Sequence, residues 1–171
     1  PPANALDVGG KVSGRAVGAK SVKGNATASS VTIGAGATVN GFVAGGMTQD
    51  GTANNNTVTI NGGTVKGTIY GSNLGVLTSS DNTMNIYRKD NRAGNIANFN
   101  IYNFYLPAGT SNGDIILHLT DKADTDMTNS KVTVRANGAL NLYNNESVYL
   151  IKKEGGELLN TGMTQDVDLK V

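Results

Sequence analysis

The chain has one histidine, His118 in the run DIILHLTD, and it is the first residue to test for catalysis. Acyl transfer needs a serine nucleophile, a histidine base and a carboxylate that orients the imidazole. The string GTSNG at 109–113 has the GxSxG form, with Ser111 at its centre. That motif requires a helix after the serine, whereas DIILHL reads as another strand. We therefore expect His118 to face solvent from a strand, and we predict no catalytic residue.

Asp121, Asp124 and Asp126 in TDKADTDMTN offer oxygen atoms that suit Ca²⁺. An EF-hand loop, however, needs Gly at its sixth position and Glu at its twelfth, and neither is present. The chain also contains no Cys, which excludes thiolate metal sites and cysteine nucleophiles. We therefore predict a solvated loop here, with no metal site and no cofactor.

Paired carboxylates would support cleavage of polysaccharides, because glycosidases place two acids on either side of the scissile bond. Their spacing in sequence does not place them in space, and Trp, a common stacking platform for sugars, is absent. A polysaccharide-active protein therefore stays an alternative prediction. The acids concerned are Asp81, Asp90, Asp114, Glu146, Glu154 and Glu157.

Tyr102, Phe104 and Tyr105 form a short aromatic run and are the candidate ligand contacts. Tyrosines combine a large apolar ring with a polar tip, so they are common anchors in recognition surfaces. The alternative is that these aromatics fill the interior where the pattern of aliphatic residues lapses. The two interpretations make opposite predictions about which way the rings point.

The composition limits the kinds of partner that the chain can take. With 14 Lys plus Arg against 13 Asp plus Glu, the formal net charge is +1, so no basic surface for nucleic acid is indicated. Charged residues make up only 16% of the chain, and 23 Gly accompany many Asn, Thr and Val residues. Such a composition is typical of chains that turn often and pair strands. A disordered linker is the alternative, but 38% hydrophobic residues recurring in register argue against it.

A repeat positions these candidates. The stretches LDVGGKVSGRAVG (6–18), VTIGAGATVNGFVAG (31–45) and VTINGGTVKGTIYG (58–71) share an apolar-polar-apolar triplet, a glycine turn and Val-x-Gly. The valines of this motif and the glycines that follow them, Gly14, Gly41 and Gly67, recur with one nearly constant spacing. That period of about 26 residues falls in the range typical of solenoids. We therefore interpret Asn61-Gly-Gly as a corner between two faces of one coil rather than a hairpin tip.

The triplets predict two inward columns of side chains with a polar column between them. Successive strand residues face opposite sides, so the outer two residues of each triplet point inward and the middle one points outward. The first inward column is Leu6, Val31, Val58, Met84 and Val132, and the second is Val8, Ile33, Ile60, Ile86 and Val134. The outward column is Asp7, Thr32, Thr59, Asn85 and Thr133. Its threonines are too few and too interrupted for an ice-binding face.

These columns predict an all-β fold, a parallel β-helix of about six coils, in one continuous domain. We expect regular coils over 1–94, an irregular coil with a protruding loop over 95–131, and further coils over 132–171. Because Met84 and Val132 lie nearly two periods apart, one extra coil is expected between them. The Asn54–Asn56 run should satisfy backbone at a corner, or stack as an amide ladder along the axis.

The segment GGMTQDGTANNNTVTINGGTVKGTIYGS (45–72) resembles passenger regions of bacterial autotransporter adhesins, and FNIYNFYLPAGTSNGDIILHLTD (99–121) is similar to another part of such passengers. The resemblance implies a right-handed β-helix displayed outside a bacterial cell, covalently part of a larger passenger with a separate outer-membrane barrel. It implies a non-enzymatic adhesin or stalk, with a host surface protein, a glycan or a sister molecule as partner. An inert structural spacer is the third alternative.

Overall fold

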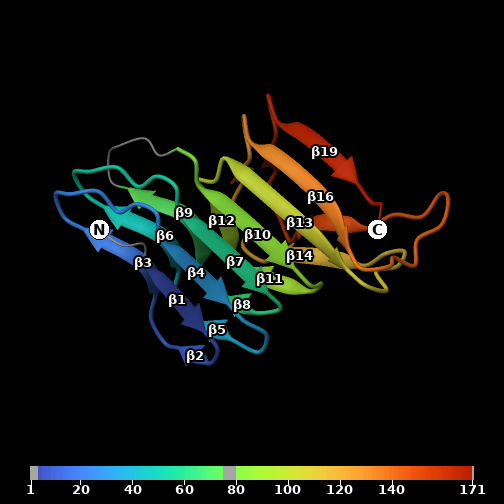
Figure 1. Cartoon of the computed structure of the whole chain (residues 1–171), viewed down its shortest axis with the longest axis horizontal. Coiled ribbons are helices and arrows are strands. Elements are labelled where there is room, and N and C mark those ends of the chain that lie inside the picture. The colour runs from blue at the N-terminus through green and yellow to red at the C-terminus, as the bar shows by residue number, and fades with distance from the viewer. Residues whose placement is uncertain (1–3, 75–79, 171) are drawn as a thin grey trace.

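The computed structural model describes residues 4–74 and 80–170, and it consists of strands joined by turns. All strand pairs in this part of the chain are parallel, and they stack into three faces around one interior (Figure 1). The predicted parallel β-solenoid is therefore confirmed. The parts of the predicted coils at 1–3, 75–79 and 171 lie outside the described residues. No helix within the described ranges is long and apolar enough to cross a membrane.

The first face is a sheet of seven strands, and the second face is a sheet of six. The third face consists of one four-stranded and one two-stranded ladder. The first face contains β1 (Ala5–Val8), β4 (Ser30–Ile33), β7 (Thr57–Asn61), β10 (Thr83–Tyr87), β13 (Ile101–Pro107), β16 (Lys131–Asn137) and β19 (Thr164–Asp168). The second contains β2 (Lys11–Val12), β5 (Thr38–Val39), β8 (Thr64–Val65), β11 (Asn91–Ala93), β14 (Ile115–Leu119) and β17 (Tyr149–Lys153). The third contains β3 (Ala16–Ser21), β6 (Val43–Thr48), β9 (Thr68–Leu74) and β12 (Asn95–Ala97), and then β15 (Thr125–Asp126) with β18 (Leu158–Leu159).

The residues of the predicted first inward column pair in register from coil to coil. Leu6 pairs with Val31, Val31 with Val58, and Val58 with Met84 along the first face. The next position in this column is Tyr102, which pairs with Met84 on one side and Val132 on the other. The extra coil expected between Met84 and Val132 is therefore present.

Residues 95–131 are the segment for which we expect an irregular coil. They contain β12, β13, β14 and β15, and β13 pairs in unbroken register with β10 and β16. The reason is that Tyr102 and Phe104 replace the aliphatic residues of the triplet, with Asn103 as its polar centre. A further loop, at 138–148 between β16 and β17, reaches out in orange on the right-hand side of Figure 1.

The irregularity lies in the coil length, because a short coil separates Met84 from its partner Tyr102 and a long coil separates Tyr102 from its partner Val132. Earlier coils return from the third face to the first through a long connection, such as 49–56 between β6 and β7. After β12 the chain reaches β13 through residues 98–100 alone. The next coil has longer corners, and its third-face strand β15 pairs with β18 in a separate ladder. The sum of the two coils is still close to two periods.

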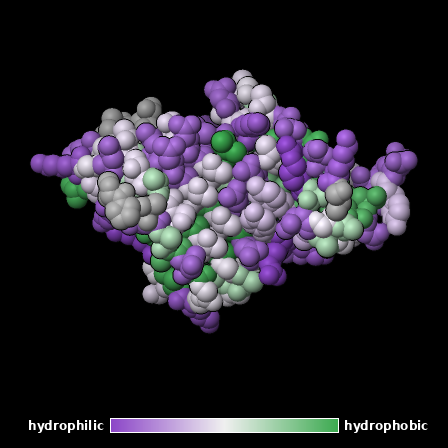
Figure 2. All heavy atoms as spheres, in the orientation of Figure 1, coloured by the Kyte–Doolittle hydropathy of each residue, from purple (hydrophilic) through white to green (hydrophobic). Residues whose placement is uncertain are grey.

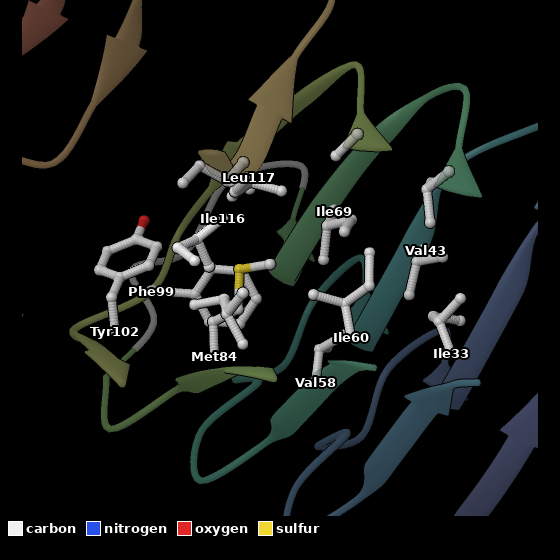
Figure 3. Close-up of a cluster of buried hydrophobic side chains, with 14 of the residues drawn as sticks. Ile33, Val43, Val58, Ile60, Ile69, Met84, Phe99, Tyr102, Ile116 and Leu117 are labelled. Atoms are coloured by element: carbon white, nitrogen blue, oxygen red, sulfur yellow. The ribbon is translucent and has the colours of Figure 1, made fainter. Parts of the chain in front are cut away.

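The interior is filled by apolar side chains from all three faces. Side chains of Ile33, Ile60 and Met84 on the first face point toward Val43 and Ile69 on the third (Figure 3). All five are fully buried. Burial of aliphatic area stabilises by roughly 25 cal/mol per Å², so these columns are the main source of stability. A single coil could not hold them, because each coil is covered by the coils before and after it.

A ladder of buried amides lines the corner that leads into the first face. The backbone N–H of Asn56 donates to Asn82 Oδ1 at 2.9 Å, and that of Asn82 donates to Asn100 Oδ1 at 3.0 Å. Ser29 begins the ladder by donating its backbone N–H to Asn56 Oδ1 at 3.1 Å. Asn56 and Asn82 are fully buried, so their amides satisfy backbone groups that water cannot reach. The expected amide ladder is confirmed for Asn56.

The repeated glycines pack where the corner after the second face stacks on the corner of the coil before it. A Cβ on Gly67 would lie 2.6 Å from the carbonyl oxygen of Gly41, and one on Gly41 would lie 2.7 Å from that of Gly14. A Cβ on Gly14, in the first coil, would have no atom within 4 Å. Glycine is therefore needed because of the backbone stacked on it, and not because of the local turn.

We expect Gly67→Ala to lower the free energy of unfolding by about 1–3 kcal/mol, since the added methyl group must displace backbone. Gly14→Ala is the matched control, because it adds the same methyl group at the same motif position in open space. It should be close to neutral. Urea unfolding followed by circular dichroism measures both variants, and equal losses of stability would contradict the stacking explanation.

Candidate functional site

The structure separates the three candidate ligand contacts. Tyr102 and Phe104 point into the interior, where their exposed fractions are 0% and 1%. Phe104 lies in the second inward column, paired with Ile86 and Val134. Both rings therefore lie where the alternative of filling the interior puts them. Tyr105, the third candidate, faces outward.

Tyr105 stacks on Tyr87, a residue that the sequence pattern did not single out. The two tyrosines pair in register on β13 and β10, and their ring centroids lie 4.4 Å apart with planes only 8° from parallel. Partial burial raises the pKa of the Tyr87 phenol, and the neighbouring Tyr105 phenol raises it further. The sequence signal was present in the pair MNIY (84–87) and YNFY (102–105), which match position by position once a coil shorter than the average period is allowed.

Polar side chains continue beside the two rings. Asn103 donates from Nδ2 to Asn85 Oδ1 at 3.0 Å, and Thr133 donates its hydroxyl to Asn103 Oδ1. Arg135 follows Tyr105 in register, and its guanidinium donates to the carboxylate of Asp166 at 3.0 Å. We call the following residues the outer ladder of the first face: Asn85, Tyr87, Asn103, Tyr105, Thr133 and Arg135.

The outer ladder is partly exposed to solvent along its length. All six of its residues are partly exposed, and white and purple residues cover the middle of this side in Figure 2. The green, apolar atoms in that view gather mainly toward its lower left and its right-hand end. The ladder therefore offers amide, hydroxyl, phenol and guanidinium groups in fixed positions about 4.8 Å apart along the axis. Such a surface can bind by many weak polar contacts.

Ser111 and His118 do not form a catalytic pair. The Nε2 of His118 lies 3.1 Å from Asp90 Oδ1, on the outer side of the second face. The backbone N–H of Ser111 donates instead to Asp114 Oδ2 at 2.8 Å, within the turn that precedes β14. As expected, a strand follows the GTSNG string where the serine motif requires a helix. Within residues 4–74 and 80–170, no hydrogen bond joins Ser111 to His118.

The Asp114 carboxylate stabilises the turn that precedes β14 through electrostatic interactions. The N–H of Ser111 lowers the pKa of the Asp114 carboxyl below its usual 3.8, with a further contribution from Lys89, whose ammonium lies 3.3 Å away. A carboxyl with a lowered pKa in the folded state stabilises the fold at neutral pH, and that contribution is lost as the pH falls through the folded pKa. This corner should therefore weaken in acid.

We expect Asp114→Asn to be less stable than wild type at pH 7 and to depend less on pH below about 4, because the substituted side chain does not titrate. Urea midpoints measured from pH 7 down to pH 3 give both quantities. Asp50→Asn, at an exposed position after β6, is the control and should follow wild type. Parallel curves for wild type and Asp114→Asn would show that this carboxylate contributes nothing.

The other acids have separate local partners. Asp121 accepts the N–H of Ala123, and Asp126 accepts that of Thr128. Asp124 accepts the N–H of Glu157 in the next coil. In the part of the chain that the structure describes, no three acidic, histidine or cysteine side chains gather as a metal site would require. These carboxylates therefore stabilise turns.

The C-terminal end of the solenoid contains an apolar cavity of about 290 Å³. It lies where the inner side of the last described coil has no further coil stacked on it, and Gln165 of β19 borders it. Its described lining includes no Asp, Glu, His, Lys or Arg, and its polar side chains are those of Tyr149 and Gln165. The apolar lining residues include Phe104, Met127, Val132, Leu150, Leu158 and Met163.

Comparison with known proteins adds no relative: no family model, no curated protein and no solved structure matches this chain. Any assignment of function therefore rests on the geometry of this chain alone. Within that geometry, the outer ladder of the first face is the most developed surface feature that is both solvated and ordered by hydrogen bonds.

Proposed function

We propose that this chain is a non-enzymatic segment of an extracellular protein on a bacterial cell surface, and that it acts as an adhesive stalk. In this proposal it belongs to an autotransporter passenger that is joined to a separate outer-membrane barrel. Its partners are host surface proteins or glycans, or sister molecules. The observation that carries the proposal is the continuous in-register solenoid with the outer ladder along one face.

The solenoid supports the stalk part of this function. Each coil adds about 4.8 Å to the axis, and each is held by ladder hydrogen bonds and a buried side-chain column. Bending the axis would break ladder hydrogen bonds and separate the packed side chains of the buried columns. The body therefore resists bending. Stiffness places the outer surface at a defined distance from the point of attachment.

The outer ladder supports the adhesive part. Contacts to single amide, hydroxyl or phenol groups are weak in water, with net contributions of about 0.5–1.5 kcal/mol each. A repeating face presents many of them in one orientation, so a partner that also repeats binds multivalently. Glycans and rows of sister molecules both have this repeating character.

The proposal is tested by screening the protein against immobilised glycans and extracellular-matrix proteins. The diagnostic variant is Asn103→Ala with Tyr105→Ala, which removes adjacent outward side chains while leaving the inward Tyr102 and Phe104 in place. Thr38→Ala with Thr64→Ala is the matched control on the outward side of the second face. We expect binding by wild type and control, and loss of binding by the diagnostic variant.

Other results would favour the remaining alternatives. Absence of any binding or self-association by wild type would indicate an inert spacer. Release of shortened oligosaccharides from a bound glycan would indicate a polysaccharide-active protein, contrary to this proposal. Equal binding by wild type and both variants would place the adhesive surface outside the outer ladder.

A further inference from the structure

The stacked pair Tyr87–Tyr105 has a geometry suited to covalent chemistry. The two rings are nearly parallel at a centroid distance of 4.4 Å, and their backbones are neighbours in one ladder, so both side chains leave the sheet in the same direction. Register therefore brings the two phenol rings face to face on the outside of neighbouring coils. Both side chains are partly exposed, so small oxidants in solution can reach them.

We propose that Tyr87 and Tyr105 form a site of oxidative cross-linking, at which one-electron oxidants join the two rings as dityrosine. Each phenol loses one electron and one proton to give a tyrosyl radical. The two radicals combine through a new carbon–carbon bond between ring positions ortho to the hydroxyls, and the two ortho hydrogens shift to restore both phenols. This inference does not depend on the adhesive function.

The oxidant is hydrogen peroxide acting through a haem peroxidase. One hydrogen peroxide accepts the two electrons and two protons and becomes two waters, so the balance closes. The protein loses two hydrogen atoms and gains none of the oxygen. Oxidation of methionine, which is the competing reaction, instead adds an oxygen atom to sulfur. The two products therefore differ in the sign of the mass change.

The other tyrosines of the chain lack this arrangement. Tyr102 is enclosed in the interior, and the ring beside Tyr70 is Phe42, met edge-on at 83°. Tyr143 and Tyr149 are exposed at 71% and 55%. In the described part of the chain, Tyr87 and Tyr105 form the one tyrosine–tyrosine ring contact. Coupling within one molecule is therefore expected at this pair.

The cross-link would join β10 to β13 on the outside of the solenoid. Solenoids gain stability from contacts between neighbouring coils, so unfolding can spread from one end coil by coil. A covalent bond between adjacent coils blocks their separation and shortens the free chain of the unfolded state, as a disulfide does. The cross-link would thus join two neighbouring coils covalently at one point of a body whose coils are otherwise held together by non-covalent contacts.

The test treats the full chain, at high dilution, with hydrogen peroxide and horseradish peroxidase. Monomeric product is isolated, and intact mass, dityrosine fluorescence and peptide mapping are measured. We expect a monomer that is lighter by two hydrogen atoms, with the link mapped to Tyr87 and Tyr105. The urea midpoint of this monomer should also rise. The variants Tyr87→Phe and Tyr105→Phe keep the ring stack and should each abolish the intramolecular product, whereas Tyr143→Phe should retain it.

Three outcomes would overturn the proposal. One is a wild-type monomer without dityrosine after treatment. Another is monomeric dityrosine that persists in Tyr87→Phe. The third is cross-linking confined to dimers through Tyr143 or Tyr149. Because phenylalanine preserves the packing of each ring, a negative result in the variants cannot be attributed to unfolding, and circular dichroism checks this directly.

Discussion

Replacing Tyr102 by alanine should remove about 3–5 kcal/mol from the free energy of unfolding, as deletion of a large buried ring does. The ring is fully buried between Met84 and Val132 in the first inward column, and it meets Phe99 edge-on at 5.5 Å. Alanine would leave a cavity across the middle of the stack, where the coils on both sides lose contacts. Since small domains have only about 5–15 kcal/mol in total, this loss is a large fraction of the stability and should lower the urea midpoint strongly.

Tyr102→Phe is the matched control and should be neutral or slightly stabilising. The hydroxyl of Tyr102 is buried and finds no hydrogen-bond partner among the described residues. Burial raises the pKa of this phenol and Asp126 raises it further, against a smaller lowering by the Phe99 backbone, so the group stays neutral. Removal of an unpaired polar group from an apolar interior breaks no hydrogen bond. It also removes the desolvation penalty that burial imposed on the hydroxyl.

Urea unfolding monitored by circular dichroism measures both Tyr102 variants, with midpoints compared at equal slope. A large loss in Tyr102→Phe would show that the hydroxyl is bonded in solution, contrary to this structure. A small loss in Tyr102→Ala would show that the column can collapse around the missing ring. If Tyr102→Phe were instead to lose partner binding without losing stability, the prediction of this ring as a ligand contact would regain support.

The second large effect is expected at Asn82, whose side chain bonds two backbone groups that belong to other coils. Its Oδ1 accepts from the N–H of Asn56 at 2.9 Å, and its Nδ2 donates to the carbonyl of Ala53 at 3.0 Å. Asn82→Ala leaves both groups unpaired in a buried corner. Each unsatisfied group costs about 1–3 kcal/mol, so we expect a total loss of about 2–6 kcal/mol.

Asn40→Ala is the control for Asn82→Ala, since Asn40 occupies an exposed corner and should tolerate the change within experimental error. Asn82→Asp is a second, sharper variant. It keeps an acceptor for Asn56 but loses the donor to Ala53 and places an ionisable group in a buried site. The pKa of its carboxyl should lie above the usual range, so the stability of this variant should fall as the pH rises above about 4, the ordinary pKa of an Asp carboxyl.

The outcome at Asn82 also decides how the corner is held. Thermal and urea unfolding of both variants at pH 5 and pH 8 distinguish a hydrogen-bond ladder from simple filling of space. A loss in Asn82→Ala that equals the loss in Asn40→Ala would contradict the ladder. Equal pH profiles for Asn82→Asp and wild type would show that water reaches this corner.

The outer ladder shows how far the candidate site can be found from sequence. The triplet pattern places Asn85 and Thr133 on the outside correctly, because the middle residue of each triplet must face away from the columns. The aromatic run points to Tyr105 but not to Tyr87, since their pairing becomes visible only when the fourth coil is allowed to be much shorter than the others. If every coil had the average length, Tyr87 and Tyr105 would occupy different positions of the repeat.

The sequence alone determined the alternation within each strand, the stacking of like residues and the recurrence of glycine at one corner. These are local or repeated properties, because side-chain direction alternates along any strand and the same triplet recurs in each coil. They were sufficient to predict the parallel solenoid and most of its columns.

Only the tertiary structure decided which aromatic rings are interior and which are paired outside. A connection such as 98–100 can be shortened without disturbing the strand register on either side, so coil length is set by closure of the whole coil and not by local pattern. That closure brings Tyr102 under Met84 and Tyr87 beside Tyr105. The register between strands that are distant in the sequence therefore determined which aromatic side chains lie on the surface. No single stretch of the sequence specifies that register.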